Sequence, residues 1–146
     1  MLLADPAASA AFGAALSPHV RPGDVITLDG PLGAGKTSIA RGLLAGLGLM
    51  GEAPSPSFAI VQPYAPPEVA LPVLHIDLYR LVDRAEMAEL GLDEAARDSL
   101  LIVEWPDRAG PGYWPGALAL RIAVEGNARR LTARVPDGWT KRWPIP

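Results

Sequence analysis

A glycine-rich stretch near the start of the chain carries the residue types that bind phosphate groups. Residues 30–37 read Gly-Pro-Leu-Gly-Ala-Gly-Lys-Thr, which fits the P-loop pattern of Gly, four residues, then Gly-Lys-Thr. In that motif the backbone N–H groups point inward at an anion, and the lysine reaches the β- and γ-phosphates. Lys36 is one of only two lysines in the chain, which otherwise uses arginine for its positive charges. Thr37 offers a hydroxyl to Mg²⁺. The pattern predicts a site for a nucleotide triphosphate and its divalent ion.

The segments on either side supply the setting that a P-loop requires. Residues 24–28 form a short apolar, β-branched run that predicts a buried strand. Residues 38–47 place their apolar side chains on one face of a helix. A glycine-rich turn before an ordinary helix is the alternative, and the order strand, loop, helix favours the P-loop.

Two further apolar segments each end in a carboxylate. Residues 73–77 end in Asp77 and residues 100–104 end in Glu104, and both predict buried strands. In an open α/β sheet, ligands bind at the carboxyl ends of the strands, so we expect both acids near the phosphates. Asp77 is either a Mg²⁺ carboxylate or a turn cap. A buried Glu104 needs a partner, which is Mg²⁺, an attacking water or an arginine.

Weaker signals lie beside these acids. Trp105 follows Glu104 at once and either stacks near the nucleotide base or packs in the core. Ser55 and Ser57 lie in the proline-rich loop that follows the P-loop helix, where P-loop enzymes carry a γ-phosphate-sensing switch. His75 shares a strand face with Asp77, and we expect it to be a core residue.

The remaining elements complete a single domain. Asp5-Pro6 predicts a helix start, and an apolar stripe along that helix consists of Ala7, Ala8, Ala11, Phe12, Ala15 and Leu16. Residues 59–62 predict a strand, and residues 63–67, rich in proline, are expected to be irregular.

The second half of the chain adds helical turns and a hairpin. Asp83 and Glu86 have capping-box spacing and open a short helix that Gly91 ends. Residues 117–124 and 130–135 alternate as antiparallel strands, and residues 136–146 are expected to form an irregular tail.

Composition excludes several classes of protein. The 146 residues are 49% hydrophobic and 20% charged, which is typical of one globular domain. The net charge of -3 argues against a surface devoted to nucleic acid, and the lack of cysteine excludes disulfides and cysteine metal sites. No positive charge precedes Arg21 and no apolar run reaches bilayer length, so we expect a soluble cytoplasmic protein without a membrane partner.

Taken together, four segments resemble the TsaE (YjeE) family of small P-loop ATPases. They are residues 30–38, 55–58, 75–81 and 103–106, and their order and spacing also match. The His-x-Asp-Leu-Tyr-Arg and Glu-Trp-Pro segments are more specific than the P-loop itself. The resemblance implies an α/β fold, a P-loop NTPase three-layer sandwich with parallel central strands flanked by antiparallel strands.

The resemblance also implies roles for particular residues. Phosphate binding would involve Gly33, Ala34, Gly35, Lys36, Thr37 and Ser38. Catalysis would involve Lys36, Glu104 and Asp77, with Mg²⁺ held by Thr37 and Glu104 and Asp77 nearby. Trp105 and the turn at Gly126 would lie close to the nucleotide, and Ser55 and Ser57 would belong to the switch-like loop. The chain departs from the family at Pro31, where Asp is usual, and at Ser57, where Thr is usual.

The activity implied by the resemblance is ATP hydrolysis inside a larger assembly. Family members act with TsaD and TsaB in threonylcarbamoyl modification of adenosine 37 in tRNAs that read codons beginning with A. They bind ATP and Mg²⁺, turn over slowly alone, meet tRNA indirectly through the complex, and are not the transferase.

Two other functions remain open. A small P-loop metabolite kinase is one, although residues 110–116, where a phosphate-binding lid would lie, contain no arginine. An adaptor that senses ATP without meaningful turnover is the other, and Glu104 argues for some hydrolysis.

Overall fold

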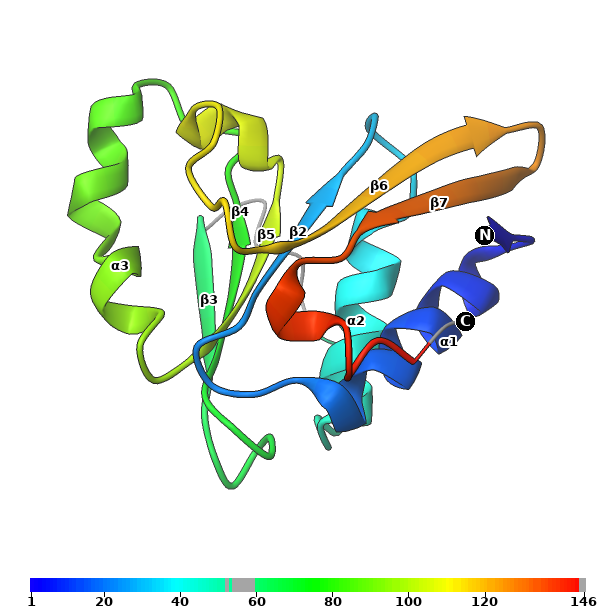
Figure 1. The fold of residues 1–146 in the computed structure, drawn as a ribbon, viewed down its shortest axis with the longest axis horizontal. Coiled ribbons are helices and arrows are strands. Elements are labelled where there is room, and N and C mark those ends of the chain that lie inside the picture. Colours follow the sequence, from blue (N-terminus) through cyan, green and yellow to red (C-terminus); the bar gives the residue numbers. More distant parts are fainter. Residues whose placement is uncertain (52, 54–59, 145–146) are drawn as a thin grey trace.

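A seven-stranded mixed sheet forms the centre of the computed structural model, which describes residues 1–51, 53 and 60–144. The strand order is β1-β7-β6-β2-β5-β4-β3. The strands are β1 Leu2–Leu3, β2 Val25–Asp29, β3 Val61–Tyr64, β4 Val73–Asp77, β5 Leu100–Glu104, β6 Leu118–Glu125 and β7 Ala128–Arg134. The four central strands β6, β2, β5 and β4 are parallel, and β1, β7 and β3 pair antiparallel. The expected α/β architecture is confirmed (Figure 1).

Helices cover both faces of the central strands. Helices α1 (Pro6–Leu16) and α2 (Lys36–Gly46) lie on one side, and the 3-10 helix η2 (Arg84–Leu90) and α3 (Leu92–Ala95) lie on the other (Figure 1). Strand β5 serves both layers, since all five of its residues are buried. Leu100 and Ile102 belong to the core under α1 and α2, while Leu101 and Val103 belong to the core under α3. This alternation is the reason that β5 reads as a continuous apolar run.

Helix α1 begins as predicted, but the face that it buries is only partly the predicted one. Asp5 is its N-cap and accepts a hydrogen bond from the Ala8 N–H at 2.8 Å. Phe12 and Leu16 of the predicted apolar stripe are buried, whereas Ala7, Ala11 and Ala15 are exposed. The buried residues are Ser9, Phe12, Gly13 and Leu16.

Close backbone contact between α1 and α2 explains that change of face. A Cβ at Gly13 would come within 2.1 Å of the Ile39 carbonyl oxygen, and one at Gly42 within 2.0 Å of the Ala10 carbonyl oxygen. The two helices therefore meet through glycines that allow a separation no larger residue would permit. A hydropathy pattern does not reveal this contact, because it depends on glycines, which have no side chain.

Strand β3 corrects a second expectation. Pro63 and Tyr64, expected to be irregular, belong to this edge strand. The Ile60 carbonyl accepts a hydrogen bond from the Asp77 N–H. Hydrogen-bonded and non-hydrogen-bonded pairs alternate along an antiparallel ladder, so Pro63 belongs to a non-hydrogen-bonded pair and its nitrogen faces away from β4. At such a position the missing N–H of proline breaks no hydrogen bond, which is why proline is tolerated there.

The other local signals are found in the structure. Asp83 and Glu86 form a complete capping box and Gly91 ends the segment at φ 65°, although the turns it opens are 3-10 rather than α-helical. Strands β6 and β7 pair as the predicted hairpin, and β6 also pairs in parallel with β2. No helix within residues 1–51, 53 and 60–144 is long and apolar enough to cross a bilayer.

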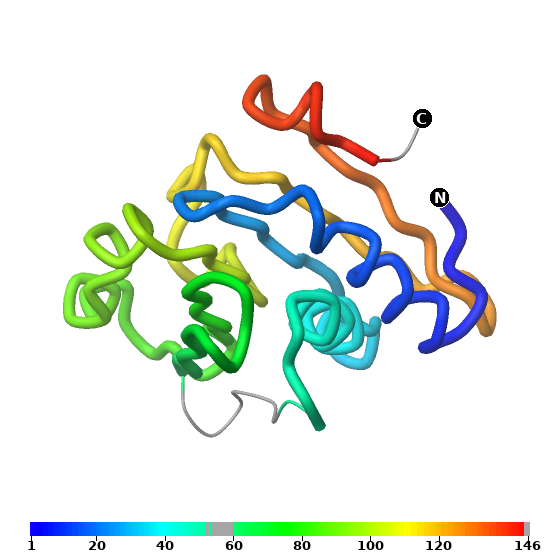
Figure 2. The backbone as a smooth tube through the Cα atoms, turned by 90° about the horizontal axis from the view of Figure 1, so that it is seen from below, coloured from blue at the N-terminus to red at the C-terminus, as the bar shows by residue number. Residues whose placement is uncertain are grey.

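The C-terminal segment returns to the side of α1, as Figure 2 shows in red. It contains one 3-10 turn, Asp137–Trp139, in which Trp139 is buried, and Trp143 packs edge-on against Phe12 with ring centroids 6.3 Å apart. The segment expected to be an irregular tail thus contributes aromatic side chains to the core under α1.

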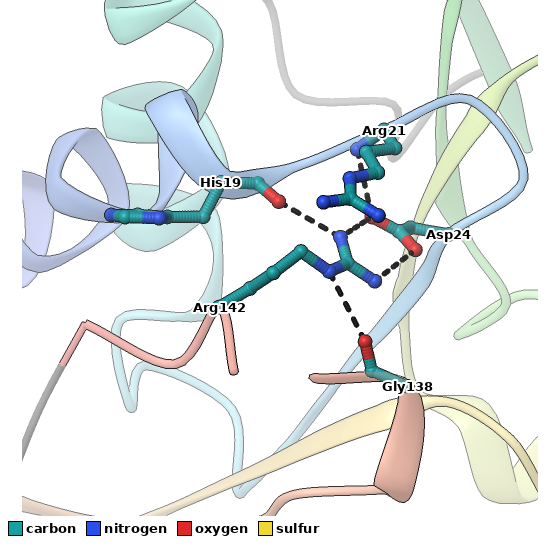
Figure 3. Close-up of polar contacts among 5 residues, drawn as sticks. All are labelled: His19, Arg21, Asp24, Gly138 and Arg142. Carbon is teal, nitrogen blue, oxygen red and sulfur yellow. Dashed lines mark hydrogen bonds and ion pairs between the residues drawn. The ribbon is translucent and has the colours of Figure 1, made fainter. Parts of the chain in front are cut away.

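A buried ion pair ties this segment to the start of β2. The Arg142 guanidinium donates from Nη1 to Asp24 Oδ2 at 2.6 Å and from Nη2 to Asp24 Oδ1 at 3.0 Å. It also donates to the carbonyls of His19 (2.8 Å) and Gly138 (3.1 Å), and the Arg21 N–H donates to Asp24 Oδ2 (2.7 Å) (Figure 3). The hydrogen bond to Asp24 raises the pKa of Arg142 above its ordinary value.

Candidate functional site

The P-loop connects the end of β2 to the start of α2. Gly35 is the N-cap of α2 with φ 99°, a conformation that glycine adopts without strain. At Gly30 an added Cβ would lie 2.6 Å from the Ile122 carbonyl oxygen, so the chain leaves β2 against the neighbouring strand β6. The loop curls over the N-terminus of an eleven-residue helix, where free backbone N–H groups favour an anion.

Lys36 is the first residue of α2 and its side chain turns back onto the loop. Its Nζ atom donates to the carbonyl oxygens of Gly30 (2.7 Å) and Pro31 (2.9 Å) and lies 4.2 Å from the centre of the Trp105 ring. The residue is 4% exposed. Burial lowers the pKa of Lys36, while the nearby carboxylates Glu104, Asp77 and Asp29 act in the opposite direction. Its ammonium group is therefore a desolvated charge held only by carbonyls and an aromatic face.

Asp77 and Glu104 end two adjacent parallel strands and lie directly opposite each other in the β4–β5 register. Asp77 is 8% exposed and Glu104 is 2% exposed. Asp77 Oδ1 accepts a hydrogen bond from the Tyr79 N–H at 2.9 Å. Burial raises the pKa of Asp77, the Tyr79 hydrogen bond lowers it, and the charge of Glu104 raises it further. The two carboxylates thus come from adjacent strand ends, and neither forms an ion pair with Lys or Arg among the described residues. Such a pair of acids favours a bound cation.

Glu104 contacts residues from two other elements. Its Oε1 accepts from the Thr37 hydroxyl at 3.0 Å, and its Oε2 lies 2.6 Å from Nε2 of His75. The sequence argument treated His75 as a core residue and did not connect it to Glu104. Its place two residues before Asp77, on the same strand face, was the available signal.

Trp105 adopts the left-handed conformation at φ 59°, alone among the non-glycine residues that the structure describes. Its ring centre lies 5.0 Å from that of Tyr79 and faces the Lys36 ammonium. The residue is half-buried. Trp105 both lines the P-loop cavity and packs against the core under α3, so stacking near the nucleotide base stays a prediction.

A cavity of about 300 Å³ gathers these residues. Its lining consists of Leu32, Gly33, Gly35, Lys36, Thr37, Ser38, Asp77, Glu104 and Trp105. A larger hollow of about 430 Å³ lies between the 106–116 segment and the outer face of β6 and β7, and is lined by Arg121, Arg134 and Trp114 among others. None of its lining residues belongs to the P-loop or to the start of α2, so the smaller cavity is the better phosphate site.

Of the remaining sequence candidates, one lies away from the cavity lining and two fall outside the described residues. Gly126 occupies the β6–β7 turn at φ 60° and is not among the residues that line the P-loop cavity. From the same hairpin, Arg129 Nη2 donates to the Gly33 carbonyl at 3.3 Å, a contact that the sequence did not suggest. Ser55 and Ser57 lie outside the described residues.

The oxygen donors of the cavity fit Mg²⁺. Thr37, Glu104 and Asp77 offer a hydroxyl and two carboxylates, the hard ligands that this ion prefers. In residues 1–51, 53 and 60–144, no cluster of three or more His, Cys, Asp or Glu side chains could hold a metal ion alone. Mg²⁺ in nucleotide sites commonly takes one or two carboxylates and completes its shell with phosphate oxygens and water.

A family model and individual relatives of known name point to the same protein family. The model of the family "Threonylcarbamoyl adenosine biosynthesis protein TsaE" matches residues 3–133. The chain is 37% identical over 135 residues to the tRNA threonylcarbamoyladenosine biosynthesis protein TsaE of Streptomyces coelicolor, covering 90% of this chain and 91% of that protein. It is 44% identical over 86 residues to the protein of the same name from Bacillus subtilis, covering 58% and 52%. The crystal structure of Bacillus subtilis YdiB aligns with a TM-score of 0.77 and 28% identity, over 97% of this chain and 87% of that one.

Proposed function

The chain belongs to the TsaE family, and from that premise we propose that it binds ATP with Mg²⁺ in the P-loop cavity and hydrolyses it. The family is described as taking part in threonylcarbamoyl adenosine biosynthesis, and so we assign this chain to that tRNA modification. The observation that carries the ATPase proposal is the convergence of Lys36, Thr37, Asp77 and Glu104 on one cavity.

Each residue has a role that follows from its place. The loop N–H groups and the start of α2 would bind phosphate oxygens, and Lys36 would exchange the carbonyls of Gly30 and Pro31 for them. Thr37 and Glu104 would hold Mg²⁺, with Asp77 nearby, and the bound ion supplies positive charge that neutralises the phosphates. Glu104 would also orient the attacking water, because its carboxylate is a hydrogen-bond acceptor at the end of β5, in the wall of the P-loop cavity.

The partners and the compartment complete the proposal. We propose that hydrolysis is coupled to a complex with TsaD and TsaB, that tRNA is met through that complex, and that the protein works in the cytoplasm. The chain supports this through its family membership and its negative net charge of -3, which does not suit a surface devoted to RNA.

An ATPase assay of the protein alone, with TsaB and TsaD, and with TsaB, TsaD and tRNA tests the proposal. We expect slow phosphate release from the protein alone and a clear increase with the partners. Fast release without partners would favour a self-sufficient enzyme. Phosphate transferred to a small molecule instead of water would favour a kinase, and no release under any condition would leave a nucleotide-sensing adaptor.

A further inference from the structure

Glu104 is held at both carboxylate oxygens. The Thr37 hydroxyl, at the start of α2, donates to Oε1 at 3.0 Å, and the His75 ring, on β4, approaches Oε2 at 2.6 Å. The His75 and Glu104 side chains are 0% and 3% exposed, so solvent does not compete for either atom. These two contacts determine the direction in which the carboxylate points.

Packing alone does not account for a histidine at this position. His75 lies inside β4, between β3 and β5, and its strand neighbours Val73 and Ile76 are fully buried and apolar. Its Nδ1 atom is buried and has no hydrogen-bond partner among the residues that the structure describes. Because an unpaired buried polar group destabilises the folded protein, an apolar residue would serve stability better here.

The bond to Glu104 supplies a reason for the histidine. A carboxylate only accepts hydrogen bonds, so Nε2 donates and the bond is charge-assisted, consistent with its short length. The terminal torsion of a glutamate side chain is broad, and without this donor the carboxylate would be free to rotate. With Oε2 fixed by His75, Oε1 remains directed at Thr37.

We propose that His75 is a positioning residue for the metal-nucleotide site, and this proposal rests on the proposed function. It acts through Glu104 by keeping one oxygen directed at the Thr37 hydroxyl, where Mg²⁺ would bind. Hydrogen-bond partners of ligating carboxylates typically change metal affinity by about 10–100-fold when they are removed.

Calorimetry of ATP binding, with Mg²⁺ and with a chelator, tests the role of His75. We expect His75→Leu to weaken the Mg²⁺-dependent part of binding by about 10–100-fold and to leave Mg²⁺-free ATP affinity unchanged. His75→Gln should restore most of the loss, because its amide N–H₂ group can take the place of Nε2. If His75→Leu does not fold, His75→Asn replaces it, since an asparagine amide is too short to reach Oε2.

A double-mutant cycle separates positioning from general stability. In a Glu104→Ala background, His75→Leu should cause no further loss of Mg²⁺-dependent binding, because the group it orients is gone. A further loss of similar size there would overturn the proposal, and so would an equal loss of Mg²⁺-free affinity. Gln and Asn variants that behave alike would overturn it as well.

The parent protein distinguishes this inference from the proposed function. If the parent shows no Mg²⁺-dependent ATP binding, the proposed function fails. If the parent binds Mg²⁺ and ATP together but every His75 variant matches it, only the role of His75 fails.

Discussion

The acids around the P-loop sheet differ in their partners: Asp24 before β2 and Asp29 at its end each pair with an arginine, whereas the acids that end β4 and β5 do not. Just before β2, both oxygens of Asp24 accept from the Arg142 guanidinium, and Oδ2 also accepts from the Arg21 N–H. Beyond the other end, Asp77 and Glu104 are more buried than Asp24, yet neither forms an ion pair with Lys or Arg among the described residues. The nearby ammonium of Lys36 donates to loop carbonyls instead.

The difference separates a contact that holds the fold together from a site prepared for a ligand. A carboxylate with a bidentate arginine has little to gain from another cation. Two desolvated carboxylates beside an ammonium and a ring of N–H groups gain a great deal from Mg²⁺ and phosphate. We therefore expect changes near Asp24 to affect stability and changes near Glu104 to affect function.

Glu104→Ala should give the largest effect. Removing a group that orients the attacking water should lower partner-stimulated turnover by about 10²–10⁴-fold. ATP binding without Mg²⁺ should persist, because the phosphate-binding loop is intact. The measurement is phosphate release with TsaB and TsaD together with calorimetry, and turnover equal to the parent would remove Glu104 from the mechanism.

Arg142→Met should have the opposite profile. It leaves Asp24 without its guanidinium, and we expect a loss of about 2–3 kcal/mol in the free energy of unfolding, less than for a fully buried pair because each side chain is 13% exposed. ATP affinity should not change. Urea denaturation measures the loss, and the exposed Arg134→Met is the matched control.

A second variant sharpens that test. Asp24→Asn combined with Arg142→Met removes both charges and should recover part of the loss. A double variant no more stable than Arg142→Met would show that stacking of the Arg142 guanidinium on the Trp139 ring, and not the ion pair, matters there.

Asp77→Asn should have the smallest effect and should stabilise the protein without ligand. The folded-state pKa of Asp77 is raised above its ordinary value of 3.8, so the native protein binds more protons between those two values. Stability therefore falls as the pH rises through that window, and the whole penalty is present at neutral pH. Asparagine removes this penalty and keeps an oxygen for the Tyr79 N–H, so the free energy of unfolding should rise slightly.

The pH dependence is the check on that gain. Thermal unfolding of Asp77→Asn and its parent should converge as the pH falls below 3.8, where the parent carboxyl becomes protonated in both states. The exposed Asp98→Asn serves as control and should show no such convergence. A gain that persists at low pH would mean that the charge of Asp77 is not its source.

Local signals in the sequence predicted much of the fold. The Asp5 N-cap, the capping box at Asp83 and the hairpin each depend on residues within a few positions of one another. The three parallel strands were evident because buried strands read as continuous apolar runs. The rule that ligands bind at strand ends led us to expect Asp77 and Glu104 near the same ligand, but it did not predict the order of the strands in the sheet.

The remaining features depend on pairings between distant segments. The contact between His75 and Glu104 requires the register of β4 and β5, and that between Arg142 and Asp24 spans 118 positions. Pro63 is allowed in a strand because β3 is an edge, which only the sheet order reveals. The face that α1 buries depends on Gly13 and Gly42, residues without the side chains that a hydropathy pattern counts.

A crystal structure with a non-hydrolysable ATP analogue and Mg²⁺ tests the central claim most directly. We predict phosphates on the N–H groups of residues 33–38, with Lys36 Nζ moved from the Gly30 and Pro31 carbonyls onto phosphate oxygens and Mg²⁺ beside Thr37 and Glu104. A nucleotide bound in the hollow beside β6 and β7 would contradict the account. So would a nucleotide on the loop with Asp77 and Glu104 turned away from the ion.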